Sequence, residues 1–275
     1  MKKKLQLLRV LAPVAFLGAY WFGRDYIEDF VGAFEGEDLG GAFEGVAGII
    51  LITALVLIPI VPFVVWVQYQ KQRTKKFKQV AEEMGFIFHP KIRDHKADKS
   101  FDLRMAVSAF DRFSKGHSPK IRNMLHRVSE QVEVGIFDYQ CTIGRGKGSR
   151  TDRESLIYFS SPGLDLPLFS IRPEGLFDKV GTVLGSQDIN FESDQTGAEF
   201  SKKYLLRGKD EQKVRELFTP EVLDFFAGQD GVSTEGRRSR LIFYRDGKRL
   251  KPEDTPAFLE EGLEVFRLFA PSQPS

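Results

Sequence analysis

VAGIILITALVLIPIVPFVVWV, the stretch from Val46 to Val67, decides how this sequence is organised. Its 22 residues are almost all aliphatic or aromatic, and no charged residue occurs between Gly45 and Gln70. As an α-helix rising about 1.5 Å per residue it would be roughly 33 Å long, which matches a hydrocarbon core of about 30 Å. Helices of this length in soluble proteins carry a polar face, which this stretch lacks. The stretch therefore predicts a transmembrane helix over residues 46–67.

A weaker apolar segment lies near the start of the chain, after a run of three lysines. Its usable span is about residues 5–22 if Arg9 extends towards the membrane surface, a length that is marginal for crossing. A signal peptide has the same basic start, but no small-x-small cleavage motif precedes Tyr20. The sequence favours a membrane hairpin, with an acidic external loop at residues 23–45, over a cleaved or interfacial segment.

The distribution of charge predicts the orientation of this hairpin. The 40 Lys and Arg and the 38 Asp and Glu give a net charge of only +2. By segment, however, the charge is +4 in residues 1–22, −6 in 23–70, +9 in 71–127 and −5 in 128–275. Basic flanks stay on the cytoplasmic side of a membrane. We therefore expect a protein of the bacterial inner membrane, with both termini and residues 71–275 in the cytoplasm.

Two sets of residues are candidates for contact with the bilayer. Trp21 and Trp66 are the only tryptophans and lie at the far ends of the two apolar segments, where interfacial anchors are common. A basic cluster follows the second segment and begins an amphipathic helix predicted over residues 73–84, ended by Gly85. Near anionic headgroups each base could contribute about 1 kcal/mol. The members of this cluster are Lys71, Arg73, Lys75, Lys76 and Lys78.

The rest of the chain predicts an α+β domain with a mainly antiparallel sheet. Alternating apolar residues predict a hairpin from strands at 123–128 and 132–143. Within the second strand the apolar residues change parity near Ile136 and Phe137, which predicts a bulge or a strong twist there. Further strands are predicted at 155–160, 168–172, 188–192 and 203–206, helices at 174–184, 210–226 and 256–269, and a last hairpin from Ser233 to Tyr244 with a turn at Asp246-Gly247. The predicted parts are a membrane hairpin (1–70), a basic helix with a connection (71–122) and a cytoplasmic domain (123–275).

Four stretches of this domain resemble an uncharacterised family of bacterial membrane proteins that have an N-terminal apolar hairpin and one cytoplasmic α+β domain. They are IFDYQCTIG (136–144), PLFSIRPEG (167–175), GSQDINFES (185–193) and FSKKYLLRGKDEQKVRELFTPEVLDFF (200–226). The resemblance supports the predicted topology and implies no activity.

A glycine-rich run at residues 144–149 has the composition of a phosphate-binding loop but not its spacing. A P-loop needs Lys followed directly by Ser or Thr, and here Gly148 separates Lys147 from Ser149. The run also lies between two strands. It is better described as a basic hairpin tip, for which a solvated, flexible turn is the favoured prediction and a phosphate or lipid contact through Arg145, Lys147 and Arg150 is the alternative.

Asp138 is the one weak candidate for a catalytic acid, because it lies in an otherwise apolar strand. A structural pair with Arg172 is the stronger prediction. The four histidines match no metal-binding spacing and Cys141 is the only cysteine, so no metal site and no cofactor are expected. The folded half is acidic overall, which argues against nucleic-acid binding.

Two functions are compatible with these features. The favoured one is a non-enzymatic membrane-anchored module that binds a partner protein or the anionic lipid surface. The alternative is a membrane-bound hydrolase or transferase with an acid site near Asp138.

Overall fold

A computed structural model describes the chain except for residues 1–45, 93–109, 115, 176–186, 192–194 and 271–275. The predicted first membrane helix, the external loop, Trp21 and most of the predicted helix at 174–184 lie outside the described residues. The chain divides into two compact units, residues 1–73 and residues 74–275.

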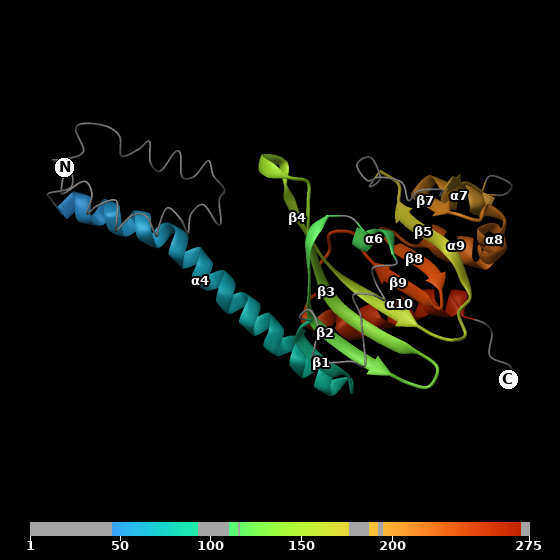
Figure 1. Ribbon diagram of the computed structural model, residues 1–275, viewed down its shortest axis with the longest axis horizontal. Coiled ribbons are helices and arrows are strands. Elements are labelled where there is room, and N and C mark those ends of the chain that lie inside the picture. Colours follow the sequence, from blue (N-terminus) through green and yellow to red (C-terminus); the bar gives the residue numbers. More distant parts are fainter. Residues whose placement is uncertain (1–45, 93–109, 115, 176–186, 192–194, 271–275) are drawn as a thin grey trace. The chain divides into compact units, whose positions relative to one another are not determined.

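The first described element is α4, which spans Val46–Glu83 (Figure 1). It joins the apolar stretch and the amphipathic helix, predicted as separate elements, into one helix of 38 residues. The side chains of its first 11 residues, 46–56, lie outside the described ones. Among the described residues, no helix has both the length and the apolar character needed to span a membrane.

The C-terminal end of α4 packs on the domain. Phe77 and Ala81 are buried, with 2% and 0% of their surface exposed. The helix ends as predicted at Gly85, whose φ of 72° is accessible to glycine at little cost. The amide of Phe86 then donates to the carbonyl of Ala81 across the turn (2.8 Å). Residues 74–83 therefore belong to the folded domain.

The domain is built on one nine-stranded sheet in which every neighbouring pair is antiparallel. This confirms the predicted α+β class with a mainly antiparallel sheet. The strand order is β1-β2-β3-β4-β9-β8-β5-β7-β6. The strands are β1 (Ile87–Lys91), β2 (His117–Val128), β3 (Glu133–Ile143), β4 (Arg150–Ser160), β5 (Leu166–Pro173), β6 (Gln187–Ile189), β7 (Tyr204–Gly208), β8 (Ser233–Arg238) and β9 (Arg240–Tyr244).

The helices that follow the strands have clear local signals. Asp210 caps α8 by accepting from the amide of Lys213 (3.2 Å), and Pro220 occupies the first turn of α9, where its missing amide costs nothing. The helix α7 was not predicted, because its polar sequence QTGAEFSKK buries only Gly197 and Phe200. The helices are α6 (Asp111–Ser114), α7 (Gln195–Lys203), α8 (Glu211–Leu217), α9 (Pro220–Gly228) and α10 (Thr255–Phe269).

The sheet has a buried core on each face. The larger, which we call the phenylalanine core, includes Phe77 of α4, Phe169 of β5 and Phe226 of α9. The smaller, which we call the tyrosine core, includes Tyr139, Tyr158 and Tyr244.

These two cores explain the change of parity within β3, for which a bulge or a strong twist was predicted; β3 itself has no bulge there. Val134 and Ile136 belong to the phenylalanine core, whereas Phe137 and Tyr139 belong to the tyrosine core. The register between β3 and β4 is unbroken from Glu133 to Ile143. The change of parity therefore reflects a strand that is covered on one face at its start and on the other face at its end. The irregularity lies in β2 instead, between Arg122 and Leu125.

The last hairpin also differs from the prediction. The strands β8 and β9 are joined at Ser239, next to Arg238 with its φ of 53°. Asp246-Gly247 forms a turn after β9 rather than within the hairpin. Asn-Gly and Asp-Gly pairs are typical of turns in general, and here the turn lies where the chain leaves the sheet after β9.

Candidate functional site

The exposed surface of α4 between residues 57 and 69 is apolar. Its large side chains are 38% to 65% exposed, although water-facing helices normally carry polar residues there. The predicted interface anchor Trp66 is one of them. The members of this apolar surface are Leu57, Ile58, Val61, Val64, Val65, Trp66 and Tyr69. A contiguous surface of this kind fits an apolar partner.

The predicted basic cluster follows directly on the same helix. Lys71, Lys75, Lys76 and Lys78 are all exposed. Lys78 lies 3.7 Å from Glu82, one turn later, in an ion pair that is open to solvent. Arg73 differs from these lysines, because only 5% of its surface is exposed. We therefore take the four lysines, without Arg73, as the basic segment of α4.

The basic hairpin tip joins β3 to β4. Arg145 and Arg150 are exposed, and the side chain of Lys147 lies outside the described ones. Arg150 pairs with Asp152 (3.1 Å), which lowers the net charge of the tip. Three of its residues form one turn of 3₁₀ helix at Gly146–Gly148, a backbone without the strand-to-helix context of a phosphate loop.

Asp138 lies in a network of hydrogen bonds on the face of the phenylalanine core. The hydroxyl of Ser155 donates to Asp138 Oδ1 (2.6 Å), and Asn123 Nδ2 donates to Asp138 Oδ2 (2.9 Å). A guanidinium NH2 of Arg249 donates to the same Oδ2 (3.0 Å). The carboxylate is 6% exposed and both of its oxygens accept hydrogen bonds. A carboxylate held in this way is a structural anion rather than a free general acid or base.

The predicted pair of Asp138 with Arg172 was wrong. Arg172 is on β5 and donates to Glu235 Oε1 on β8 (2.7 Å). The prediction recognised that Asp138 would be paired structurally, but sequence alone did not reveal that its cation, Arg249, comes from the segment after β9.

A second buried ionic network, which no sequence pattern predicted, lies on the opposite face of the sheet. Glu235 accepts from Arg172, from the Tyr244 hydroxyl (3.0 Å) and from the backbone amide of Arg112 (3.2 Å). Glu154 is fully buried, pairs with Arg112 Nε, and accepts from the Gly247 amide (3.2 Å). We call these residues the ionic network.

Burial shifts the proton affinities of this network. Burial raises the pKa of Glu154, although the attraction of Arg112 opposes the shift. Burial, the largest single influence, would lower the pKa of Arg112, but the charge of Glu154, its hydrogen bond to Arg112 and the nearby Tyr244 and Cys141 together outweigh burial, and the pKa is raised. Burial is also the main reason that the pKa values of Tyr139 and Tyr244 are raised. The tyrosines therefore stay neutral and the arginines stay charged at neutral pH.

Tyr139 differs from Tyr244 in one respect. Its hydroxyl is buried and has no hydrogen-bond partner among the described residues. The ring of Tyr139, in contrast, has two favourable contacts. It packs edge to face against Phe113 (4.6 Å between centroids), and the guanidinium carbon of Arg112 lies over it, 5.6 Å from the ring centroid. These contacts fix α6 on the tyrosine core.

Neither network has the arrangement of a catalytic centre in the part of the chain that the structure describes. No three His, Cys, Asp or Glu side chains there are grouped as metal ligands. A surface depression of about 540 Å³ is lined by Glu211, Gln212, Arg215 and Glu216 of α8, and by no residue of either network. The buried ionic groups are therefore best explained as supports for the fold.

Comparison with known proteins adds little to this description. No family model and no curated protein matches the chain. A solved structure, the crystal structure of the mycobacterial trehalose monomycolate transport factor A, TtfA, is similar with a TM-score of 0.49 and 12% identity. The match covers 74% of this chain and 98% of that one. The similarity is too low to transfer a function, and the resemblance to a family of bacterial membrane proteins stays a prediction of the sequence.

Proposed function

We propose that the protein is a non-enzymatic module of the bacterial inner membrane, anchored through α4, whose domain lies in the cytoplasm and contacts the lipid surface. One observation carries the proposal. The helix α4 runs unbroken from an exposed apolar surface at residues 57–69, through four exposed lysines at residues 71–78, to a last part in which Ala81 is buried in the domain; Phe77, between two of the lysines, is buried as well. Membrane, headgroup layer and cytoplasm would meet these three parts in the same order.

The energetics agree with this order. Each lysine near anionic headgroups is worth about 1 kcal/mol, so the basic segment of α4 contributes about 4 kcal/mol before salt screening. A membrane would also cover the apolar surface of α4, which is otherwise in contact with water. A catalytic role receives less support, since the carboxylate of Asp138 is occupied by three donors.

Fractionation of the full-length protein with a reporter after Ser275 tests the proposal. We expect a fluorescent cytoplasmic reporter to be active, an alkaline phosphatase reporter to be inactive, and the protein to stay in membranes washed with sodium carbonate. The double variant Val61→Glu/Val65→Glu should weaken this retention, because a carboxylate inside the membrane costs about 2.5–3.5 kcal/mol.

A matched control is available on the sheet. Ile87 and Val128 are 64% and 65% exposed, and the variant Ile87→Glu/Val128→Glu carries the same change of charge outside α4. It should remain in the membrane like the wild type. Active phosphatase, or release of the wild-type protein by carbonate, would refute membrane anchorage in this orientation.

A further inference from the structure

A second basic surface lies on strands β2 to β4, on the same face as Asp138. Partner residues in antiparallel strands place their side chains on the same face. Lys120, Gln140 and Arg153 are partners across the three strands. Arg153 Nε donates to Gln140 Oε1 (3.3 Å), which confirms that these side chains share a face. The row of partners above it is Arg122, Asp138 and Ser155.

The charge of this surface is not balanced locally. Asp138 is the only carboxylate in these two rows and in the next one, which pairs Thr142 with Thr151. Its charge is matched by Arg249. Three cations of these rows remain. Lys120 and Arg153 are exposed, and Arg122 is half-buried. We call Lys120, Arg122 and Arg153 the basic strand patch.

A chain of hydrogen bonds links this patch to α4. The Thr74 hydroxyl donates to Asn123 Oδ1 (2.9 Å), and Asn123 donates in turn to Asp138. Asn123 has a φ of 51° in the irregular part of β2, which turns its side chain to the Asp138 face next to that of Arg122. The exposed lysines Lys75, Lys76 and Lys78 start one residue after Thr74.

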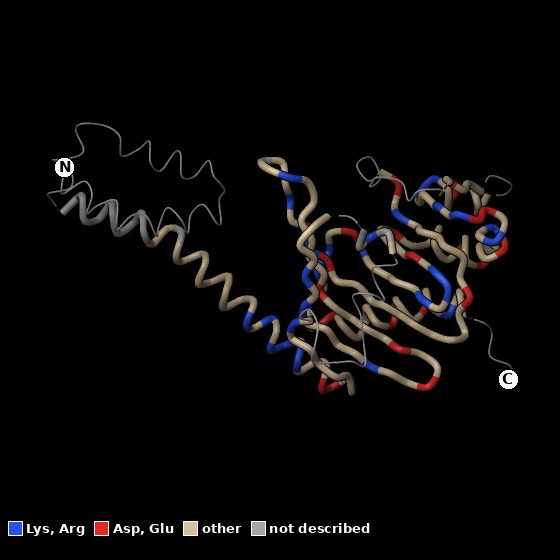
Figure 2. The backbone as a smooth tube through the Cα atoms, in the orientation of Figure 1, with Lys and Arg blue, Asp and Glu red and all other residues tan. Residues whose placement is uncertain are grey.

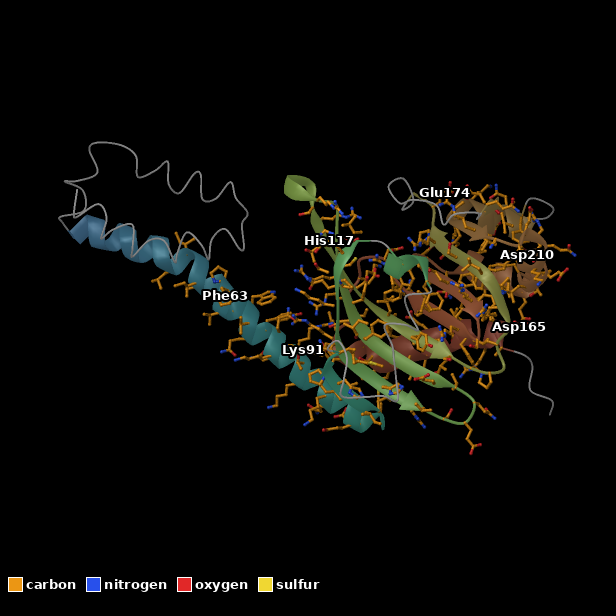
Figure 3. The ribbon with its side chains drawn as sticks, in the orientation of Figure 1. Phe63, Lys91, His117, Asp165, Glu174 and Asp210 are labelled. Carbon is orange, nitrogen blue, oxygen red and sulfur yellow. The ribbon has the colours of Figure 1, made fainter. Side chains whose placement is uncertain are left out.

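Lys75, Lys76 and Lys78 therefore lie on the same side of the domain as the basic strand patch. Figure 2 shows blue segments at the C-terminal half of α4 and along β2 to β4. Figure 3 shows nitrogen-ended side chains along the same strands below His117, which marks the start of β2. An α-helix rises about 1.5 Å per residue, so these three lysines of α4 follow within roughly 6 Å of the point where Thr74 meets β2.

We propose that the basic strand patch binds the phosphate groups of anionic phospholipids in the same bilayer that holds α4, as a second contact beside the lysines of the helix. This inference rests on the proposed function. Two of the three residues are arginines, whose planar guanidinium groups bind phosphate through two parallel hydrogen bonds. The patch extends the basic segment of α4 into a surface, and a surface matches a bilayer better than it matches one free phosphate ion.

Energy transfer in reconstituted vesicles tests the inference with the full-length protein. A donor dye is attached to Ser149→Cys, at the exposed tip between β3 and β4, while the native Cys141 is 0% exposed and does not compete for the label. The acceptor is a headgroup-labelled lipid. Vesicles contain phosphatidylcholine alone or phosphatidylcholine with phosphatidylglycerol.

We expect transfer to rise with phosphatidylglycerol and the rise to disappear at high salt. The variant Lys120→Glu/Arg153→Glu loses two attractive bases and adds two repelled carboxylates, so it should lower the ratio of bound to free patch by at least about 30-fold and abolish the rise. Lys202 and Lys209 are exposed on and near α7, so Lys202→Glu/Lys209→Glu is a control with the same change of charge and should keep it.

The results separate this inference from the proposed function. If the protein resists carbonate extraction from the vesicles but transfer is the same in both lipids, or the same in the patch variant, the patch does not bind lipid and a protein partner becomes the better explanation. If the protein is extracted by carbonate, membrane anchorage itself fails. An unchanged thermal unfolding midpoint of each variant shows that loss of transfer is not loss of folding.

Discussion

The two faces of the sheet are both buried, but by different means. The phenylalanine core is covered by helices and joins rings such as Phe169, Phe218 and Phe269, whose centroids lie 5.2 to 5.8 Å apart. The tyrosine core holds the ionic network and is covered in part by α6, which contributes Arg112. The first face is stabilised mainly by the removal of apolar surface from water, and the second depends on matched charges and hydrogen bonds.

The tyrosine face can hold the buried carboxylates of Glu154 and Glu235 because each is paired with a buried arginine. Leaving one member of a buried ionic network unpaired costs several kcal/mol, whereas an apolar face loses stability in proportion to the volume removed. We therefore expect the removal of one polar side chain from the tyrosine face to cost more stability than the removal of a few methyl groups from the phenylalanine face. The predictions below compare the two faces for the full-length protein in detergent micelles.

The largest effect is expected for Glu235→Ala. The substitution would leave the guanidinium of Arg172 and the hydroxyl of Tyr244 without their shared acceptor, so we expect a loss of about 3–5 kcal/mol in the free energy of unfolding. Urea unfolding measures it. Glu253→Ala, at an exposed site, should change stability by about 0.5 kcal/mol or less. The triple variant Arg172→Met/Glu235→Leu/Tyr244→Phe should recover much of the loss, because it also removes the two side chains that would be left without their acceptor, and failure to recover would mean that the charges themselves stabilise this face.

A smaller effect distinguishes two tyrosines of the same core. Tyr244→Phe removes a hydrogen bond to a carboxylate and should cost about 1.5–3 kcal/mol. Tyr139→Phe removes a buried hydroxyl that has no partner in the described part of the chain, so it should be neutral or slightly stabilising. Equal losses in both variants, measured by the same urea unfolding, would contradict the assignment of these two hydroxyls.

On the phenylalanine face, Gly262→Ala tests close packing. A Cβ at Gly262 of α10 would lie 2.6 Å from Ile157 Cδ1 of β4. Overpacking costs about 1–3 kcal/mol, while alanine gains about 1 kcal/mol of helix propensity over glycine. We expect a net loss of about 1 kcal/mol in thermal or urea unfolding. Adding Ile157→Val removes the clashing methyl group and should restore stability, whereas a stabilised single variant would show that α10 is not tightly packed.

A final effect, which appears only at alkaline pH, is a dependence of stability on pH. Burial raises the folded-state pKa values of Tyr139 and Tyr244 above the ordinary value of about 10, so the unfolded chain loses these protons first. Their contribution to stability is complete below pH 10 and is lost as the pH rises, by about 1.4 kcal/mol per pH unit for each tyrosine. Urea midpoints between pH 9 and 11 measure the slope. Tyr139→Phe should reduce it, and the exposed control Tyr69→Phe should leave it unchanged.

Sequence patterns predicted the elements of the fold better than their connections. The alternation of β2 and β3, the cap of α8 and the stop at Gly85 are local signals, and the structure confirms them. The short strand β1 and the helix α7 carry weak patterns, and α7 was missed because only two of its nine residues are buried.

The candidate site shows the same limit. The basic segment of α4 could be found because its lysines are adjacent in the sequence. The pairing of Glu235 with Arg172 could not, because the two residues are 63 positions apart and meet only when β8 pairs with β5. The basic strand patch was missed for the same reason, since Lys120 and Arg153 share a face only through the register of three strands.

The strand order has a consequence for the synthesis of the chain. The centre of the sheet is formed by β8 and β9, which are made last: β9 pairs with β4, and β8 pairs with β5. When the ribosome has produced residues up to Gly208, the sheet exists only as two halves with open edges at β4 and β5. Open edges of this kind favour aggregation, and closing such distant pairs is slow. The two halves can join only after Tyr244, the last residue of β9, has been made.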